Sequence, residues 1–83
     1  MSVDPRKIHA IVAHALREAG DKSPFEDSES LVASGRLSSL DVVNILLEIK
    51  QSFGIEVHAD EFDVLRFDTV ESIAELVGEA SAR

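Results

Sequence analysis

The sequence predicts an all-α protein, a small four-helix bundle with a long first loop and a short third helix. Three observations lead to this prediction. Apolar residues recur at helical spacing in three segments, and capping or turn residues bound those segments. The one alternating stretch, residues 55–57, is too short to form a sheet.

Composition limits the classes of protein to consider. The 83 residues are expected to form one domain, 1–83. The net charge of −8 argues against nucleic acid and favours a basic protein surface as partner. The sequence has no cysteine, which excludes disulfides and thiolate metal sites. The first residues lack a signal-peptide hydrophobic region, and no apolar run reaches the roughly 20 residues that span a bilayer, so we expect a cytoplasmic protein.

The first helix is predicted from about Pro5 to Ala19. Asp4 is the expected N-cap, Pro5 suits the first helical position, and Gly20 ends the helix. Its buried face consists of Ile8, Ile11, Val12, Ala15, Leu16 and Ala19.

A long loop follows over residues 20–37. Its acidic residues Glu26, Asp27 and Glu29 do not follow the ligand order of an EF-hand, so we expect a solvated loop and no metal site. The apolar residues that we expect to attach this loop to the core are Phe25, Leu31, Val32 and Leu37.

The second helix is predicted to begin at Ser38 or Ser39, with Ser38 and Asp41 forming a capping box. Its apolar residues fall into two stripes. The stripe expected to face the core consists of Val42, Ile45, Leu46, Ile49 and Phe53. The second, called here the apolar stripe, consists of Leu40, Val43 and Leu47. Neighbouring helices cover it, or it stays exposed for a partner; the residues alone favour coverage.

The remaining residues predict a connector and two helices. Ile55 and Val57 are expected to be buried in the connector, and a short third helix is expected over residues 60–65 with Phe62 and Leu65 inward. Asp68 is the expected cap of the last helix, which should fray from Gly78. Its predicted buried face consists of Val70, Ile73, Leu76, Val77 and Ala80.

No pattern of catalytic residues is evident, so we predict a protein that is not an enzyme. No motif pairs a serine with a base, and there is no glycine-rich phosphate loop. His9 and His14 fall on different helix faces, not at metal-ligand spacing, and we expect them and His58 to be exposed to solvent. Ser39 would lie at a helix N-terminus, where a phosphate ester is tolerated, although the residues alone favour a cap.

The run ASGRLSSLDVVNILLEIKQSFGIEV, followed by FDTVESIAELV, resembles the phosphopantetheine carrier family. This family comprises acyl carrier proteins and the related peptidyl and aminoacyl carrier domains. Its hallmark is Asp-Ser-Leu at the start of the second helix, where this chain has Ser38-Ser39-Leu40. Further landmarks are residues 53–57 and the pair at 69–70, and the resemblance covers roughly residues 31–77. Asn44 and Lys50 stand where carriers of the fatty-acid synthase type often have acids.

In that family the serine carries a covalent 4′-phosphopantetheine arm from coenzyme A, whose thiol holds the cargo as a thioester. The resemblance implies that Ser39 is the attachment site. It also implies a docking face of Leu40, Asp41, Val43, Leu47 and Glu48. The acyl pocket that it suggests is lined by Val43, Leu47, Phe62 and Leu65.

The resemblance also implies a fold like that of acyl carrier proteins and a set of partners. These are a phosphopantetheinyl transferase, an acyl- or aminoacyl-loading ligase, and acyl-processing enzymes with basic docking patches. We therefore expect a freestanding, monomeric carrier in lipid metabolism, such as fatty acid biosynthesis. The alternative is an unmodified helical adaptor that binds a partner protein through the apolar stripe.

Overall fold

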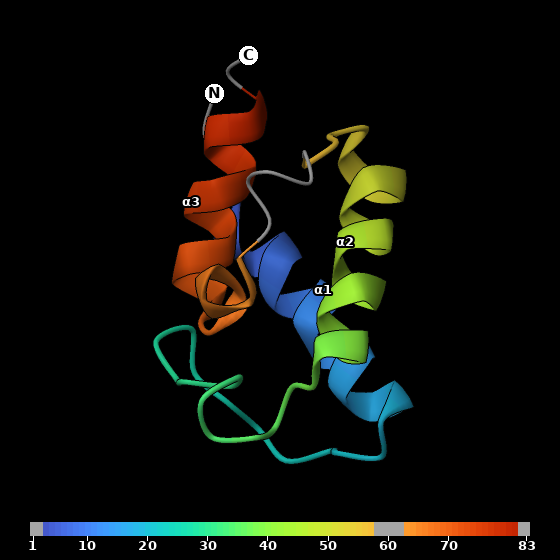
Figure 1. Cartoon of the computed structure of the whole chain (residues 1–83), viewed down its shortest axis with the longest axis vertical. Coiled ribbons are helices and arrows are strands. Elements are labelled where there is room, and N and C mark those ends of the chain that lie inside the picture. The colour runs from blue at the N-terminus through green and yellow to red at the C-terminus, as the bar shows by residue number, and fades with distance from the viewer. Residues whose placement is uncertain (1–2, 58–62, 82–83) are drawn as a thin grey trace.

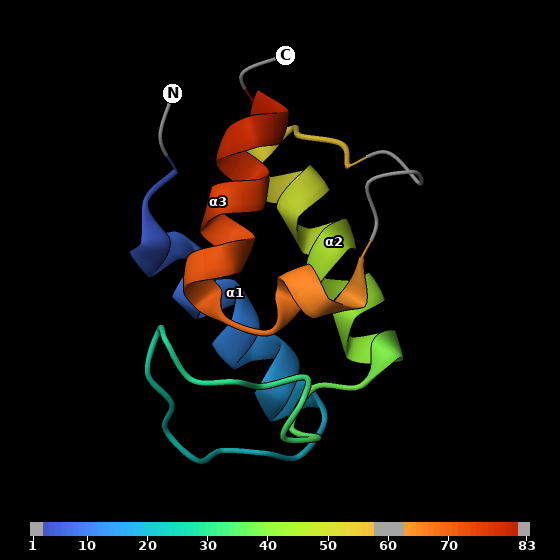
Figure 2. The same cartoon turned by 60° about the vertical axis from the view of Figure 1, so that its left-hand side comes forward.

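The computed structural model describes residues 3–57 and 63–81. The elements follow in the order α1 (Pro5–Glu18), α2 (Ser39–Phe53), η2 (Val64–Phe67) and α3 (Val70–Ser81). No strand occurs within these two described ranges, which confirms the predicted all-α fold. α1 contacts both α2 and α3, and the short 3₁₀ helix η2 also contacts both (Figures 1 and 2).

The core is built almost entirely from aliphatic side chains on the predicted helix faces. In α2, Val42, Ile45 and Ile49 are buried, while Leu46 and Phe53 are partly buried against the core. The other buried hydrophobic residues are Ile8, Ile11, Val12, Ala15, Leu16, Leu31, Leu37, Phe67, Val70, Ile73, Leu76 and Val77. Burial of these apolar side chains is the main contribution to stability, since the described residues bury no polar or charged residue.

Both ends of α1 lie where the sequence predicts them, but Ala19, expected on the buried face, is exposed because it caps the helix end. The Asp4 carboxylate accepts a hydrogen bond from the Arg6 N–H at 2.9 Å, and Pro5 occupies the first helical position. The helix is capped at Ala19, and Gly20 follows with a φ of 91°, a left-handed conformation that glycine adopts without strain.

The first loop, residues 19–38, is fixed to the core and closes one end of the bundle (Figure 1). Leu31 and Leu37 are buried, and Phe25 and Val32 are partly buried, as predicted. Arg36, which is not among the residues singled out from the sequence, crosses this loop. Its guanidinium donates to a Glu29 carboxylate oxygen at 2.7 Å, to Asp21 at 2.9 Å and to two backbone carbonyls, and this hydrogen bonding lowers the pKa of Asp21.

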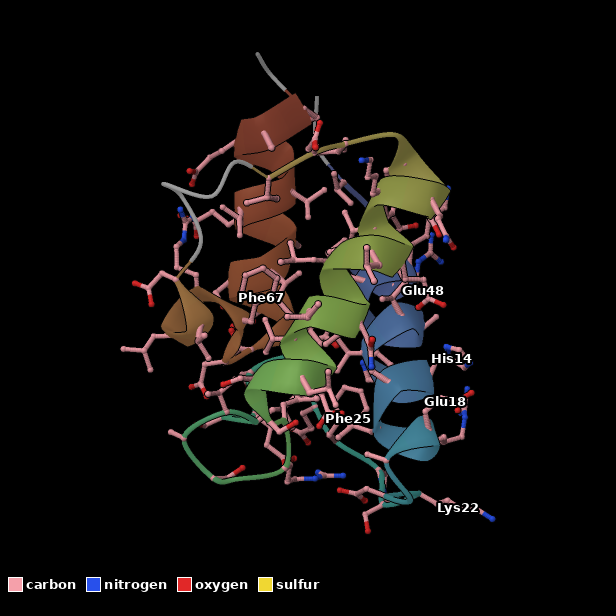
Figure 3. The ribbon with its side chains drawn as sticks, turned by 45° about the vertical axis from the view of Figure 1, so that its right-hand side comes forward. His14, Glu18, Lys22, Phe25, Glu48 and Phe67 are labelled. Atoms are coloured by element: carbon pink, nitrogen blue, oxygen red, sulfur yellow. The ribbon has the colours of Figure 1, made fainter. Side chains whose placement is uncertain are left out.

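The short third helix differs from its prediction in position and in facing. The structure places a 3₁₀ helix over Val64–Phe67, whereas residues 60–62 and Phe62 in particular lie outside the described residues. Leu65 is 68% exposed, so the prediction that it points inward is wrong. Phe67 is fully buried instead and lies between α2 and α3 (Figure 3). The Asp63 carboxylate accepts from the Leu65 N–H at 3.0 Å and sets the start of this helix.

The prediction that Asp68 caps the last helix is wrong. Thr69 performs that role, because its Oγ1 accepts from the Ser72 N–H at 3.0 Å. The Asp68 carboxylate instead accepts hydrogen bonds from the first loop.

The predicted buried face of α3 is confirmed at Val70, Ile73, Leu76 and Val77, and Ala80 is half-buried. Regular helix continues to Ser81, past Gly78, where we expected the tail to fray.

Candidate functional site

α2 begins with the predicted capping box. The Ser38 Oγ accepts from the Asp41 N–H at 3.2 Å, and the Asp41 carboxylate accepts from the Ser38 N–H at 2.9 Å. Each side chain therefore satisfies a backbone donor of the first turn, which defines where the helix starts.

Ser39 is the first residue of α2, and its hydroxyl is exposed. Across residues 3–57 and 63–81, no hydrogen bond involves this hydroxyl or the backbone N–H groups of Ser39 and Leu40. Leu37, two residues earlier, is only 2% exposed, and its N–H donates to the Leu31 carbonyl at 2.9 Å. The exposed Ser39 hydroxyl therefore lies two residues after a leucine that is packed in the core.

These surroundings fit a phosphate ester on Ser39. Two backbone N–H groups at the positive end of the helix dipole are available to a phosphate oxygen. The Asp41 carboxylate is a negative group in the same turn, but its hydrogen bond to Ser38 holds it at the cap. No base in the described part of the chain contacts the hydroxyl, so nothing there activates it as a nucleophile.

The apolar stripe is exposed in the structure. Leu40 is 69% exposed, Val43 43% and Leu47 55%. The alternative in which neighbouring helices cover this stripe is therefore wrong. Asp41 and Glu48, the two acids of the expected docking face, are half-buried.

A shallow groove of about 230 Å³ lies between α2 and the connector that follows it. Val43 and Leu47, two of the four residues expected to line an acyl pocket, contribute to it. Leu65 does not line this groove, and Phe62 lies outside the described residues. The lining residues are Val43, Leu46, Leu47, Lys50, Ile55, Glu56 and Val57. Lys50 forms an ion pair with Glu56 at 3.5 Å.

The two described histidines have different environments. His9 was expected to be exposed but is half-buried, with its ring stacked on Phe25 at a centroid distance of 4.2 Å and its Nδ1 2.7 Å from an Asp27 oxygen. His14 is exposed and contacts Glu18 and Glu48. His58 lies outside the described residues. Where the structure describes the chain, no group of three His, Asp or Glu side chains is suited to hold a metal ion.

Within the described residues, no helix is both long enough and apolar enough to cross a bilayer.

Comparisons with known proteins agree with this geometry. The model of the phosphopantetheine attachment site family matches residues 6–77. The solution NMR structure of a holo acyl carrier protein from Nitrosomonas europaea matches with a TM-score of 0.76 and 24% identity, covering 95% of this chain and 96% of that one. A comparison with curated proteins found no match. The chain therefore belongs to the phosphopantetheine attachment family, as a carrier protein with covalently attached 4′-phosphopantetheine and not an enzyme.

Proposed function

We propose that Ser39 is the attachment residue, and that the chain delivers a thioester-bound acyl or aminoacyl intermediate to partner enzymes. The observation that carries this proposal is the difference between two adjacent serines. The Ser38 hydroxyl is engaged in the capping box, whereas the exposed Ser39 hydroxyl has no hydrogen bond among the described residues. Esterification of Ser38 would disturb the start of α2, and esterification of Ser39 leaves it intact.

The attached group supplies a thiol that holds the cargo, and the protein supplies the surface that partners recognise. We propose that partners bind the docking face, in which Leu40, Val43 and Leu47 are exposed and Asp41 and Glu48 add negative charge. An exposed apolar stripe beside acids fits a partner with an apolar patch rimmed by basic residues. The partner classes are a phosphopantetheinyl transferase, a loading ligase and acyl-processing enzymes.

We also propose that the groove beside α2 shelters part of the cargo. Val43 and Leu47 line it together with the connector residues Ile55 and Val57. Because Leu65 is exposed, it can contact a cargo only from the surface of η2. The acidic, cysteine-free composition suits a monomeric, single-domain carrier in the cytoplasm.

The test of Ser39 is modification of the purified apo-protein by a phosphopantetheinyl transferase with coenzyme A and Mg²⁺, followed by intact mass measurement. We expect one phosphopantetheinyl group on the wild type, none on Ser39→Ala, and one on the matched control Ser38→Ala. Modification of Ser39→Ala, or an unmodified wild type, would overturn the assignment. The alternative adaptor function predicts an unmodified wild type, and membership of the phosphopantetheine attachment family gives it no support.

The docking face is tested by the rate of the same reaction. Leu47→Asp should lower kcat/KM of the transferase about tenfold, the effect of losing a central apolar contact of an interface. Leu65→Asp is the matched control, since it introduces the same charge at a similarly exposed leucine on η2. Equal rates for both variants would contradict the proposed docking face.

A further inference from the structure

His14 connects α1 to the docking face on α2. Its Nδ1 lies 3.1 Å from a Glu48 carboxylate oxygen, and its Nε2 lies 3.2 Å from a Glu18 oxygen one turn along α1. Figure 3 shows His14 and Glu18 on α1 and Glu48 on the neighbouring α2, at the same edge of the molecule. Each ring nitrogen of the imidazole therefore faces its own carboxylate.

This geometry distinguishes the two protonation states of His14. A neutral imidazole has one N–H and can donate to only one of the two carboxylates. An imidazolium has two N–H groups and donates to both. Only the protonated ring satisfies both contacts, and protonation also makes the group of His14, Glu18 and Glu48 less negative by one charge.

Among the described residues, the groove around His14 contains no ionisable side chain besides those of His14, Glu18 and Glu48. It has a volume of about 300 Å³ and is lined by residues of α1 and α2 alone. The ionisable residues among them are His14, Glu18 and Glu48, and neither η2 nor α3 contributes one. The His14 side chain is 52% exposed and is therefore in contact with solvent, and the Glu48 side chain is 32% exposed. Leu47 of the apolar stripe also lines this groove.

We propose that His14 is a positioning residue that makes docking through Glu48 dependent on pH. When His14 is protonated, it holds the Glu48 carboxylate against α1 and withdraws that one negative charge from a basic partner. When His14 is neutral, it makes at most an uncharged hydrogen bond with Glu48, so the Glu48 carboxylate keeps its charge for the partner. This inference rests on the proposed function, because it assumes that partners bind the docking face.

The first experiment is an NMR titration of the isolated protein that follows the His14 ring and the Glu48 side-chain carboxyl carbon. We expect the Glu48 signal to shift along the His14 titration curve in the wild type and to lose that shift in His14→Gln. The matched control His9→Gln removes a histidine that contacts Phe25 and Asp27, and it should preserve the Glu48 shift. A Glu48 signal that is the same in wild type and His14→Gln would overturn the proposal.

The second experiment measures kcat/KM of a phosphopantetheinyl transferase for the apo-protein from about pH 5.5 to 8. The ratio of wild type to His14→Gln cancels the transferase's own pH dependence. We expect a ratio near one at high pH and a fall of about two- to fivefold at low pH, the size typical of one exposed ion pair. The fall should disappear when both proteins also carry Glu48→Gln.

The outcomes separate this inference from the proposed function. Absence of modification at Ser39 would contradict the proposed function. Normal modification with a ratio that does not vary with pH would overturn only the role of His14. A fall that persists in the Glu48→Gln background would also overturn it, because His14 would then act through its own charge.

Discussion

The Asp68 carboxylate accepts a hydrogen bond from the Ser30 hydroxyl at 2.9 Å, across 38 positions of sequence. The same oxygen accepts the N–H groups of Val32 and Ala33, each at 2.9 Å, and the Asp68 carbonyl accepts the Leu31 N–H at 2.7 Å. Asp68, which lies between η2 and α3, therefore holds the middle of the first loop in place. The Ala33 N–H, followed by the Ser30 hydroxyl, lowers the pKa of Asp68 by favouring its charged form.

This lowered pKa predicts a specific loss of stability in acid. Because the folded-state pKa lies below the unfolded one, Asp68 stabilises the fold above its unfolded pKa, and that contribution disappears as pH falls through the folded pKa. Below about pH 4, the wild type should lose more unfolding free energy than Asp68→Asn, which keeps an acceptor oxygen but cannot ionise. Urea unfolding followed by far-UV circular dichroism at neutral and acid pH measures the difference. Equal losses in the two proteins would contradict the prediction.

The capping box makes Ser38 a stability residue. Ser38→Ala removes the side chain that accepts from the Asp41 N–H and should lower the free energy of unfolding by about 1 kcal/mol. Ser38→Asp keeps an N-cap acceptor and should retain nearly full stability. Chemical denaturation of both variants provides the measurement, and an Ala variant as stable as the Asp variant would speak against the cap.

Phe67 and Leu65 form a matched pair that tests the facing of η2. Phe67 is fully buried, so Phe67→Ala should destabilise the fold by about 3 to 5 kcal/mol through lost burial and a cavity. Leu65 is 68% exposed, and Leu65→Ala should change stability by no more than about 0.5 kcal/mol. Thermal unfolding shows which variant is less stable. If Leu65→Ala were the less stable one, Leu65 rather than Phe67 would face the core.

The net charge of −8 predicts that salt stabilises the fold. Acidic groups repel one another less when counterions screen them, so Tm should rise as ionic strength increases from about 0.01 to 0.15 M. Thermal unfolding across a sodium chloride series, and in Mg²⁺ at matched ionic strength, provides the measurement. A Tm that stays constant would show that charge repulsion contributes little.

Sequence periodicity was sufficient for the three long helices because each presents several apolar residues to one core. It was insufficient for η2, whose four residues are too few for a periodic pattern. Asp68 and Thr69 are both capping residue types, and local sequence does not reveal that the Asp68 carboxylate is engaged by Ser30 of the first loop.

For the candidate site, the sequence predicts the position of the residues along the chain but not their contacts or exposure. The two serines before Leu40 identify the start of α2, but only the structure shows which hydroxyl is engaged in the cap. The exposure of Leu47 depends on whether another helix packs there, which helical spacing alone does not determine. The contact between His14 and Glu48 joins residues on different helices and has no local signature.

The burial of Leu37 has a mechanical consequence for anything attached to Ser39. With Leu37 packed in the core and α2 starting at Ser39, a single residue separates a fixed point of the core from the helix. The backbone there has little freedom to swing. A group attached to Ser39 would therefore move about one nearly fixed point of the surface, and its reach would be set by its own length. A partner enzyme would need to bind with its active site within that reach of the start of α2. The orientation of the bound partner would then decide whether the attached group enters the active site.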